Sequence, residues 1–169
     1  MDKINYRWCT LNDIVLSDKL AELFVGNTNN NYISHGEVID GRANSMNEWK
    51  GEIKEIMRDE FTEAMGNSFD LPDTFSKLAI ALQDKNIIAL ALIEFHPKTK
   101  VIILSDIVVN AQLRGQKIGE LMFSWIETEA KTWGVKYIFL ESGNSNHSAH
   151  RFFERVGFHT SSVVMVKEI

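Results

Sequence analysis

Cysteine is nearly absent from this chain of 169 residues, in which Cys9 is the one example. A single cysteine excludes an internal disulfide and is typical of proteins in a reducing compartment. The sequence also lacks an apolar run long enough to span a bilayer, and its first residues lack the apolar core of a signal peptide. These absences predict a cytoplasmic protein without a membrane-spanning segment.

An excess of positive charge is absent as well. The chain carries 18 Lys and Arg against 23 Asp and Glu, a formal net charge of −5. This balance disfavours nonspecific binding of nucleic acid, which depends on cationic side chains. The sequence has no internal repeat, low-complexity segment or interdomain linker. Its length and its 44% hydrophobic content suit one core, so we expect a single domain over residues 1–169.

The apolar periodicity predicts an α/β fold. A capping-box pattern at Thr10 and Asp13 is followed by apolar residues at helical spacing. Apolar residues recur at helical spacing over 46–65, 115–133 and 149–156. Short turns between residues 75 and 109 predict an antiparallel meander, and the helix that follows predicts a parallel crossover. We therefore expect a mixed central sheet flanked by helices, with strands at 6–9, 75–83, 87–95, 101–109, 136–141 and 163–167.

The junction after the strand at 101–109 is the most informative part of the chain. Gly115 and Gly119 let the backbone approach a ligand, and Arg114 and Lys117 add positive charge where the next helix begins. Free N–H groups at a helix N-terminus attract anions, so this junction predicts a site for a phosphorylated cofactor. The phosphate loop of nucleotide-binding proteins needs Gly-Lys followed by Ser or Thr, which is absent here.

Two motifs in this half of the chain match a known family. Residues 112–119 resemble the acetyl-CoA pyrophosphate loop of the GNAT superfamily of N-acetyltransferases, whose pattern is Gln or Arg, two residues, Gly, one residue, then Gly or Ala. Gln112 and Gly115 fit this pattern, whereas Lys117 stands in the place of Gly or Ala. The family's second pattern, Asn-x-x-Ala-x-x-x-Tyr and later Gly-Phe, is matched by Asn146, Ala149, Phe153, Gly157 and Phe158, with Phe in the place of Tyr.

The resemblance implies a GNAT fold and acetyl-CoA as co-substrate. It implies transfer to a primary amine of a small molecule, with a protein amine as the alternative acceptor. Transfer should be direct, because no cysteine lies in the catalytic segment to carry the acetyl group. Family members are often dimers, so a homodimer is compatible. The residues expected to bind acetyl-CoA are Ile107, Val108, Val109, Arg114, Gly115, Gln116, Lys117, Ile118, Gly119 and Asn146.

Asp106 is the candidate general base on the central strand, because an amine with a pKa near 10.4 must lose a proton before it attacks. The equally weighted alternative is a carboxylate paired with an arginine or lysine. Strict alternation would place the neighbouring Ser105 on the opposite face of the sheet. The resemblance implies a β-bulge at this point, which would splay the strand from the next one.

The acceptor amine leaves a weaker signal in the sequence. Tyr32, His35 and Glu37 lie in a polar stretch that would cover the acceptor site in this family, and Glu141 ends a strand. An ordinary surface loop and a solvated strand end are the alternatives. No metal site is expected, because the pair of histidines at 147 and 150 has no cysteine nearby.

Phe153 is the departure from the family pattern with the largest consequence. In many relatives the tyrosine at this place protonates the leaving thiolate, and phenylalanine has no proton to give. Phe153 is therefore expected to line the thioester rather than to act as an acid. A CoA-binding sensor or interaction module without catalysis is the rival interpretation, and this substitution is its main support.

Overall fold

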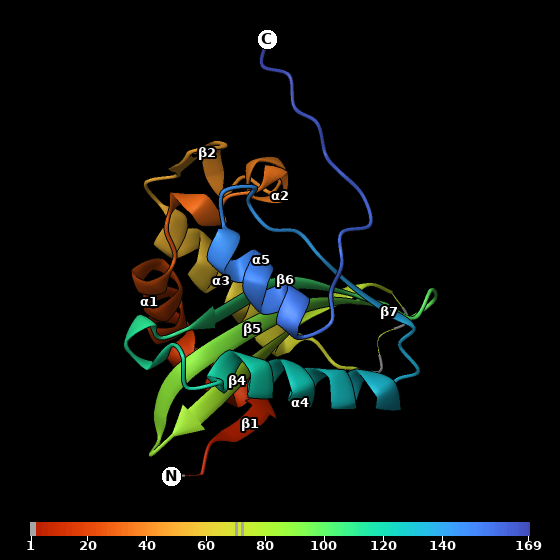
Figure 1. The fold of residues 1–169 in the computed structure, drawn as a ribbon. Helices are drawn as coiled ribbons and strands as arrows, with labels where there is room; N and C mark the ends of the chain where they lie inside the picture. Colours follow the sequence, from red (N-terminus) through yellow and green to blue (C-terminus); the bar gives the residue numbers. More distant parts are fainter. Residues whose placement is uncertain (1–2, 70, 72) are drawn as a thin grey trace.

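A computed structural model describes residues 3–69, 71 and 73–169 of the chain. It confirms the mixed sheet, whose strands run in the order β1-β4-β5-β6-β7 (Figure 1). The first three pairs in this order are antiparallel, and β6 and β7 are parallel. The strands are β1 (Asn5–Trp8), β4 (Phe75–Gln83), β5 (Asn86–His96), β6 (Val101–Val109) and β7 (Tyr137–Leu140).

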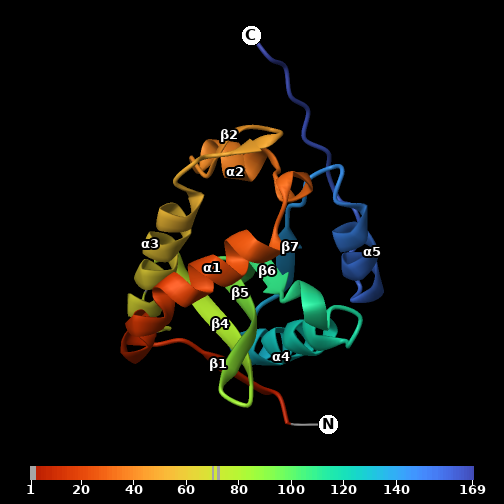
Figure 2. The same ribbon diagram turned by 90° about the vertical axis from the view of Figure 1, so that its left-hand side faces the viewer.

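Helices cover both faces of the sheet (Figure 2). α1 (Ser17–Asn27) and α3 (Ile53–Gly66) pack on one face, and α4 (Ile118–Thr132) packs on the other beside α5 (His147–Arg155). The short elements are η1 (Leu11–Leu16), η2 (Asn30–Tyr32), α2 (His35–Ile39), β2 (Ala43–Ser45), β3 (Glu48–Trp49) and η3 (Ala111–Leu113).

The sheet separates two hydrophobic cores because successive side chains of a strand point to opposite faces. Along β4, Leu78 and Ile80 join the core with α1 and α3, whereas Ala79 and Ala81 join the core with α4. The small alanines let α4 pack close to the strands. These four side chains are completely buried. The sheet is therefore a rigid support for the residues at its edges.

A β-bulge interrupts β6 at Ser105. Leu92 of β5 pairs with Asp106, and the next residue, Ile93, pairs with Leu104, so Ser105 has no partner in this register. One extra residue turns the following side chains to the opposite face. Leu104 accordingly lies in the core with α4, whereas Asp106 and the residues beyond it follow the reversed alternation.

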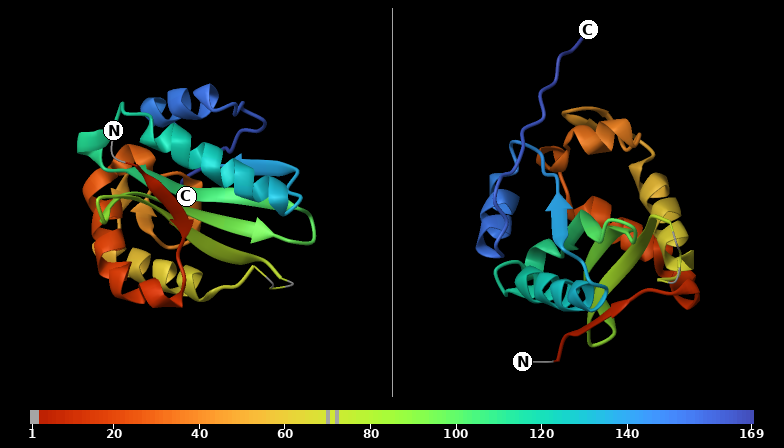
Figure 3. Two further views of the ribbon diagram at one scale, coloured as in Figure 1. Left: turned by 90° about the horizontal axis from the view of Figure 1, so that it is seen from below. Right: turned by 90° about the vertical axis from the view of Figure 1, so that its right-hand side faces the viewer.

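The parallel pairing of β6 with β7 ends at the same place. It runs from Val101 opposite Tyr137 to Leu104 opposite Leu140 and goes no further. Beyond Leu104, β6 continues along β5 to Val109, whereas β7 ends at Leu140 and the chain after it leads away to α5 (Figure 3). Within the described part of the chain, β6 therefore has an edge without a strand partner from Ser105 to Val109.

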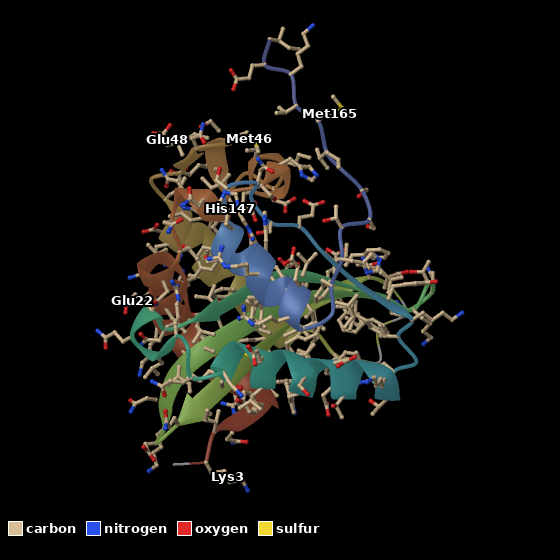
Figure 4. The ribbon with its side chains drawn as sticks, viewed as in Figure 1. Lys3, Glu22, Met46, Glu48, His147 and Met165 are labelled. Atoms are coloured by element: carbon tan, nitrogen blue, oxygen red, sulfur yellow. The ribbon has the colours of Figure 1, made fainter. Side chains whose placement is uncertain are left out.

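The helix predicted over 46–65 is wrong in its first part. Helix α3 begins only at Ile53, and the preceding residues form a hairpin of β2 and β3, on which Figure 4 labels Met46 and Glu48. The apolar spacing of Met46, Trp49 and Ile53 imitates a helix, but Trp49 packs edge-on against Phe24 of α1 instead. Tertiary packing here overrides a local period.

The strand predicted at 163–167 is also wrong, because residues 158–169 form no helix or strand. The helix predicted over 115–133 begins three residues late, at Ile118, because Lys117 before it adopts a left-handed conformation with φ of 63°. The helix predicted over 149–156 begins two residues early, at His147.

A buried ion network fastens the segment before α3 to the sheet. The Arg42 guanidinium donates to the Asp106 carboxylate over 3.1 Å, and its Nε donates to Glu60 over 3.0 Å. The Tyr32 hydroxyl donates to the other Asp106 oxygen over 2.8 Å. Burial disfavours the charge of Arg42, but Asp106 and Glu60 outweigh it and raise the pKa of the guanidinium. The arginine is therefore charged at any pH at which the protein folds.

Replacing Arg42 with methionine should lower the free energy of unfolding by about 3–5 kcal/mol, because it leaves a fully buried carboxylate without its cation. The matched control is Arg58→Met, which removes an exposed pair with Asp59 and should change stability by less than about 0.5 kcal/mol. Urea denaturation at pH 7 measures both. Adding Asp106→Asn to Arg42→Met should recover part of the loss. Equal costs for the two arginine variants would contradict the role given to this network.

Candidate active site

A cavity of about 490 Å³ lies where β6 and β7 separate. Four segments line it: the end of α1 with η2, the bulged part of β6, the loop into α4, and the chain from β7 into α5. The space opens where β6 continues beyond the end of β7, and α4 and α5 form its walls. Of the residues predicted for the site, the cavity is lined by Tyr32, Ile107, Val108, Val109, Arg114, Gly115, Lys117, Ile118, Gly119, Glu141, Asn146 and Phe153.

Four predicted site residues do not line this cavity: His35, Glu37, Asp106 and Gln116. The cavity is also lined by residues that the sequence analysis did not predict for the site. Some of them lie next to predicted residues and could have been found by extending the predicted set: Ser148 lies inside the second motif, and Ser142 follows Glu141. Others, such as Asn27 and Thr28, come from α1 and carry no local signal of a ligand. The missed lining residues are Asn27, Thr28, Asn29, Leu104, Ser105, Leu113, Glu120, Ser142, Ser148, Ala149, Phe152 and Arg155.

One end of the cavity is cationic and rich in free backbone donors. Gly115 has φ of 81° and Lys117 has φ of 63°, so the loop turns sharply and Lys117 becomes the N-cap residue of α4. The first N–H groups of α4 have no partner inside the helix, and the helix dipole adds positive potential there. Arg114 also lines the cavity, and so does Arg155, whose Nε lies 3.2 Å from the carboxylate of Glu120 in the first turn of α4. This set of donors suits a pyrophosphate.

Asn27 holds the cationic loop in place from the end of α1. Its side-chain oxygen accepts from the backbone N–H of Ala111 over 2.6 Å, and its backbone oxygen accepts from Arg114 over 2.5 Å. Gly119 acts differently, since a Cβ there would stand 3.3 Å from the ring of Phe152. The first glycine of the motif allows the turn, and Gly119 allows α5 to pack on α4.

The middle of the cavity is formed by the open edge of β6. Ser105, Ile107, Val108 and Val109 all line it. Because no strand pairs this edge within the described residues, its backbone N–H and C=O groups are available to an extended ligand. Phe153 lines the opposite side and packs against Phe152 and Phe158, with ring centroids 5.1 and 5.7 Å apart.

Asp106 occupies the ion-paired environment that was one of its two sequence alternatives. It is almost completely buried, is paired with Arg42, and accepts from the hydroxyl of Tyr32. Burial, and then the negative charge of Asp106, raise the pKa of Tyr32 well above its usual value, so the phenol stays protonated. Arg42 lies 64 residues before Asp106, and nothing in the local sequence marks the two as partners.

Glu141 lines the other end of the cavity, and its carboxylate is contacted by an imidazole that lies outside the lining. His35 Nδ1 lies 3.2 Å from a carboxylate oxygen of Glu141, and both side chains are partly exposed. Two of the four acceptor candidates thus meet. Glu37 serves the backbone instead: it accepts from the Ser34 N–H over 2.6 Å and from the Ser34 hydroxyl over 2.7 Å, which caps α2.

Gly143 allows the segment before α2 to reach this end of the cavity. It is buried, and a Cβ at this position would collide with the backbone oxygens of Asn31 and Ile33. Only glycine permits this approach, which brings His35 next to Glu141. Gly143 was not singled out in the sequence, where it lies two residues after the strand end at Glu141.

Cys9, the one thiol, is remote from this chemistry. Its side chain is fully buried in the core with α1 and α3, and burial raises the pKa of the thiol to about 12. Among residues 3–69, 71 and 73–169, no three His, Cys, Asp or Glu side chains gather as metal ligands. None of the helices that the structure describes is long and apolar enough to cross a membrane.

Similar folds occur among solved structures. The PaiA N-acetyltransferase from Thermoplasma acidophilum, in complex with coenzyme A, aligns with a TM-score of 0.69 and 16% identity over 96% of this chain and 93% of that one. An aminoglycoside N-acetyltransferase, AAC(6')-Iy, in complex with CoA, aligns with a TM-score of 0.64 and 11% identity over 100% of this chain and 96% of that one. At these identities the likeness concerns the fold.

A curated relative is closer in sequence over a shorter stretch. The aminoalkylphosphonate N-acetyltransferase of Salmonella typhimurium is 33% identical over 66 residues, which are 39% of this chain and 43% of the relative. The chain thus matches less than half of that protein's length. The model of the acetyltransferase (GNAT) family matches residues 44–158, a stretch that includes both motifs and three walls of the cavity. The chain belongs to the GNAT acetyltransferase family.

Proposed function

We propose that this protein, as a single domain, transfers an acetyl group from acetyl-CoA directly to a primary amine of a small molecule. The observation that carries the proposal is the order of groups along one cavity. Cationic and backbone donors lie at one end, an open strand edge lies in the middle, and the Glu141–His35 pair lies at the other end. This order matches a long phosphorylated thioester whose reactive end meets an amine.

The cationic end fits the pyrophosphate of CoA. Arg114 and Lys117 would neutralise its charge, and the first N–H groups of α4 would bond its oxygens. Asn146 and the open edge of β6 would hold the amide-bearing arm that follows. Acetyl-CoA supplies an activated acyl group, and two solved structures of similar fold are CoA complexes, which supports the same ligand here.

Glu141 is the residue that we propose for binding the amine and removing its proton. A primary amine is a cation at neutral pH, so a carboxylate at the cavity wall attracts it and then accepts its proton. His35 orients that carboxylate from the far side. Asp106 suits this task less well, because its carboxylate is neutralised by Arg42 and lies outside the cavity lining.

The backbone of β6 would stabilise the charge that develops on the thioester oxygen. An N–H group on a rigid strand does so without reorganisation, and at residues 107–109 the groups that face away from β5 have no strand partner in the described chain. For the leaving thiolate, Phe153 offers no proton, and the hydroxyl of Tyr32 already donates to Asp106. Water that enters the open cavity is therefore the proposed proton source.

A small amine suits the site better than a protein amine. The cavity of about 490 Å³ must hold the end of CoA together with the acceptor, which leaves room for a compact group. The relatives named for aminoalkylphosphonate and aminoglycoside acetylation act on small molecules, in line with this choice. The second candidate function, CoA binding without catalysis, is favoured by Phe153 alone.

Acetyl-CoA at about a hundred times its Kd should add about 2.7 kcal/mol to the stability of the fold, visible as a rise in Tm, whereas ATP should not. Gly115→Val should abolish this rise. The matched control is Gly134→Val, because Gly134 also has positive φ (73° against 81°) and open space around it but lies outside the cavity. A rise that survives in the Gly115 variant, or is absent from the wild type, would contradict the proposed cofactor site.

Glu141→Gln should lower kcat/KM for amine acetylation by about 10²–10⁴-fold, because the amine then loses its proton acceptor. The variant should keep the rise in Tm with acetyl-CoA. Glu94→Gln is the control, since Glu94 forms a second Glu–His pair, with His96, remote from the cavity. The measurement is release of free CoA thiol with a panel of small amines.

One result would contradict the assignment of the base, and another would contradict the function itself. Equal rates in the wild type and the Glu141 variant would place the base elsewhere. Tight binding of acetyl-CoA by the wild type with no thiol release from any amine would favour the sensor.

A further inference from the structure

Tyr32 offers its ring, rather than its hydroxyl, to the candidate active site. The residue lines the cavity and is partly buried. Its hydroxyl donates to Asp106 over 2.8 Å, and Asp106 is almost completely buried outside the cavity lining. Because the hydroxyl is engaged in the buried network, the part of Tyr32 that is left for a ligand is the aromatic ring. The reaction steps described above give this ring no task.

Two other aromatic side chains hold the Tyr32 ring in place. The rings of Phe24 on α1 and Trp49 on β3 have their centroids 5.6 and 6.1 Å from that of Tyr32. Phe24 is completely buried, so this packing is anchored in the core. Together with the hydrogen bond to Asp106, it leaves the ring little freedom to turn. A ligand that contacts a ring held in this way loses little affinity to the ordering of the side chain.

The Tyr32 ring and the Glu141 carboxylate belong to the same end of the cavity. Both residues line it. Gly143, two residues after Glu141, approaches the backbone oxygens of Asn31 and Ile33 so closely that a Cβ would collide with them. These two residues flank Tyr32 in the chain. An aromatic ring and a carboxylate therefore lie near each other where the acceptor amine is proposed to bind.

The lysine and arginine side chains of the cavity lie elsewhere. Among the described residues, those that line it are Arg114 and Lys117 on the loop into α4, and Arg155 on α5. Arg114 donates to the backbone oxygen of Asn27, and Arg155 donates to the carboxylate of Glu120. In the described lining, an anionic group at the acceptor end would therefore meet no lysine or arginine, whereas a cation would meet a carboxylate and an aromatic ring.

We propose that the ring of Tyr32 binds the ammonium group of the acceptor and selects it by its charge. This inference rests on the proposed function, which places the amine at Glu141. The face of an aromatic ring carries negative potential and attracts a cation, most strongly where water is displaced. The hydrogen bond from the phenol to the Asp106 carboxylate shifts electron density toward the ring and strengthens that potential. Tyr32 is thus a specificity-determining residue, and Glu141 remains the proton acceptor.

The ring and the carboxylate together define the class of acceptor. An alkylammonium can place its charge at Glu141 and its apolar carbon atoms against the ring of Tyr32. A carboxylate or phosphonate on the carbon that carries the amine would meet the charge of Glu141 and the negative face of the ring, and like charges repel. The acceptor is therefore an alkylamine without an acid group beside its nitrogen, and it binds as the cation before Glu141 takes its proton.

Calorimetric titration of the full chain saturated with CoA tests this role with two probes of one shape. Choline carries a quaternary ammonium without a transferable proton, and 3,3-dimethylbutan-1-ol is its neutral counterpart, with carbon in the place of nitrogen. The wild type should bind choline more tightly than the alcohol. Tyr32→Leu should reduce this preference by about 5–30-fold, whereas Tyr32→Phe, which keeps the ring but loses the hydrogen bond to Asp106, should reduce it by less than about threefold.

Tyr137→Leu is the control, because Tyr137 is an exposed tyrosine outside the cavity lining, and this variant should keep the preference of the wild type. The rise in Tm with acetyl-CoA shows which variants keep the cavity, and Tyr32→Met replaces Tyr32→Leu if the latter does not. The proposal is overturned by equal binding of the two probes to the wild type, by a full preference in the variant without the ring, or by its loss in Tyr32→Phe.

Probe binding and thiol release separate this inference from the proposed function. Absence of thiol release with any amine would contradict the function, but the preference for choline is measured on binding alone and still decides the role of Tyr32. Acetylation of amines by a wild type that binds both probes equally would keep the function and refute the role of the ring. Alanine and 2-aminopropane differ by a carboxylate in the place of a methyl group, so 2-aminopropane should compete with choline, and competition by alanine would refute the acceptor class.

Discussion

The bulge at Ser105 is the constraint on which the rest of the site depends. One unpaired residue in β6 reverses the facing of every later side chain, which puts Asp106 on the side of α1 and α3. The pairing of β6 with β7 ends at the residue before it. An edge of a central strand is thereby left open inside the protein, where a sheet would normally have no free backbone groups. The cavity, its walls and its backbone donors all follow from this interruption.

The two faces of β6 have different roles. On one face, Asp106, Arg42 and Tyr32 form a buried network that holds the segment 30–42 against the sheet. That segment carries His35, and the close approach at Gly143 brings it to Glu141. Asp106, the candidate base of the sequence analysis, thus holds the segment that brings His35 to Glu141 in the structure. Stability and chemistry are coupled here, because loss of the network would also displace His35.

Local patterns in the sequence predict what depends on local physics. The strand Val101–Val109 and the turn at Gly115 are encoded by neighbouring residues, and both appear where the sequence places them. The pairing of Asp106 with Arg42 could not be predicted, since it joins residues 64 positions apart. The helix expected from Met46 fails because three apolar residues share a helical period by coincidence. The strand expected at 163–167 does not form, because no strand among the described residues pairs with this segment.

Hydrogen exchange of the backbone amides, measured with and without CoA, tests most directly whether the interrupted strand is the binding surface. The open edge of β6 should gain protection at residues 105–109, and the first turn of α4 should gain it at residues 118–120, because ligand atoms replace the missing strand and cap the helix. Both segments should respond together, and β4 should not change. Unchanged exchange at 105–109 with saturating CoA would contradict the central role given to the bulge.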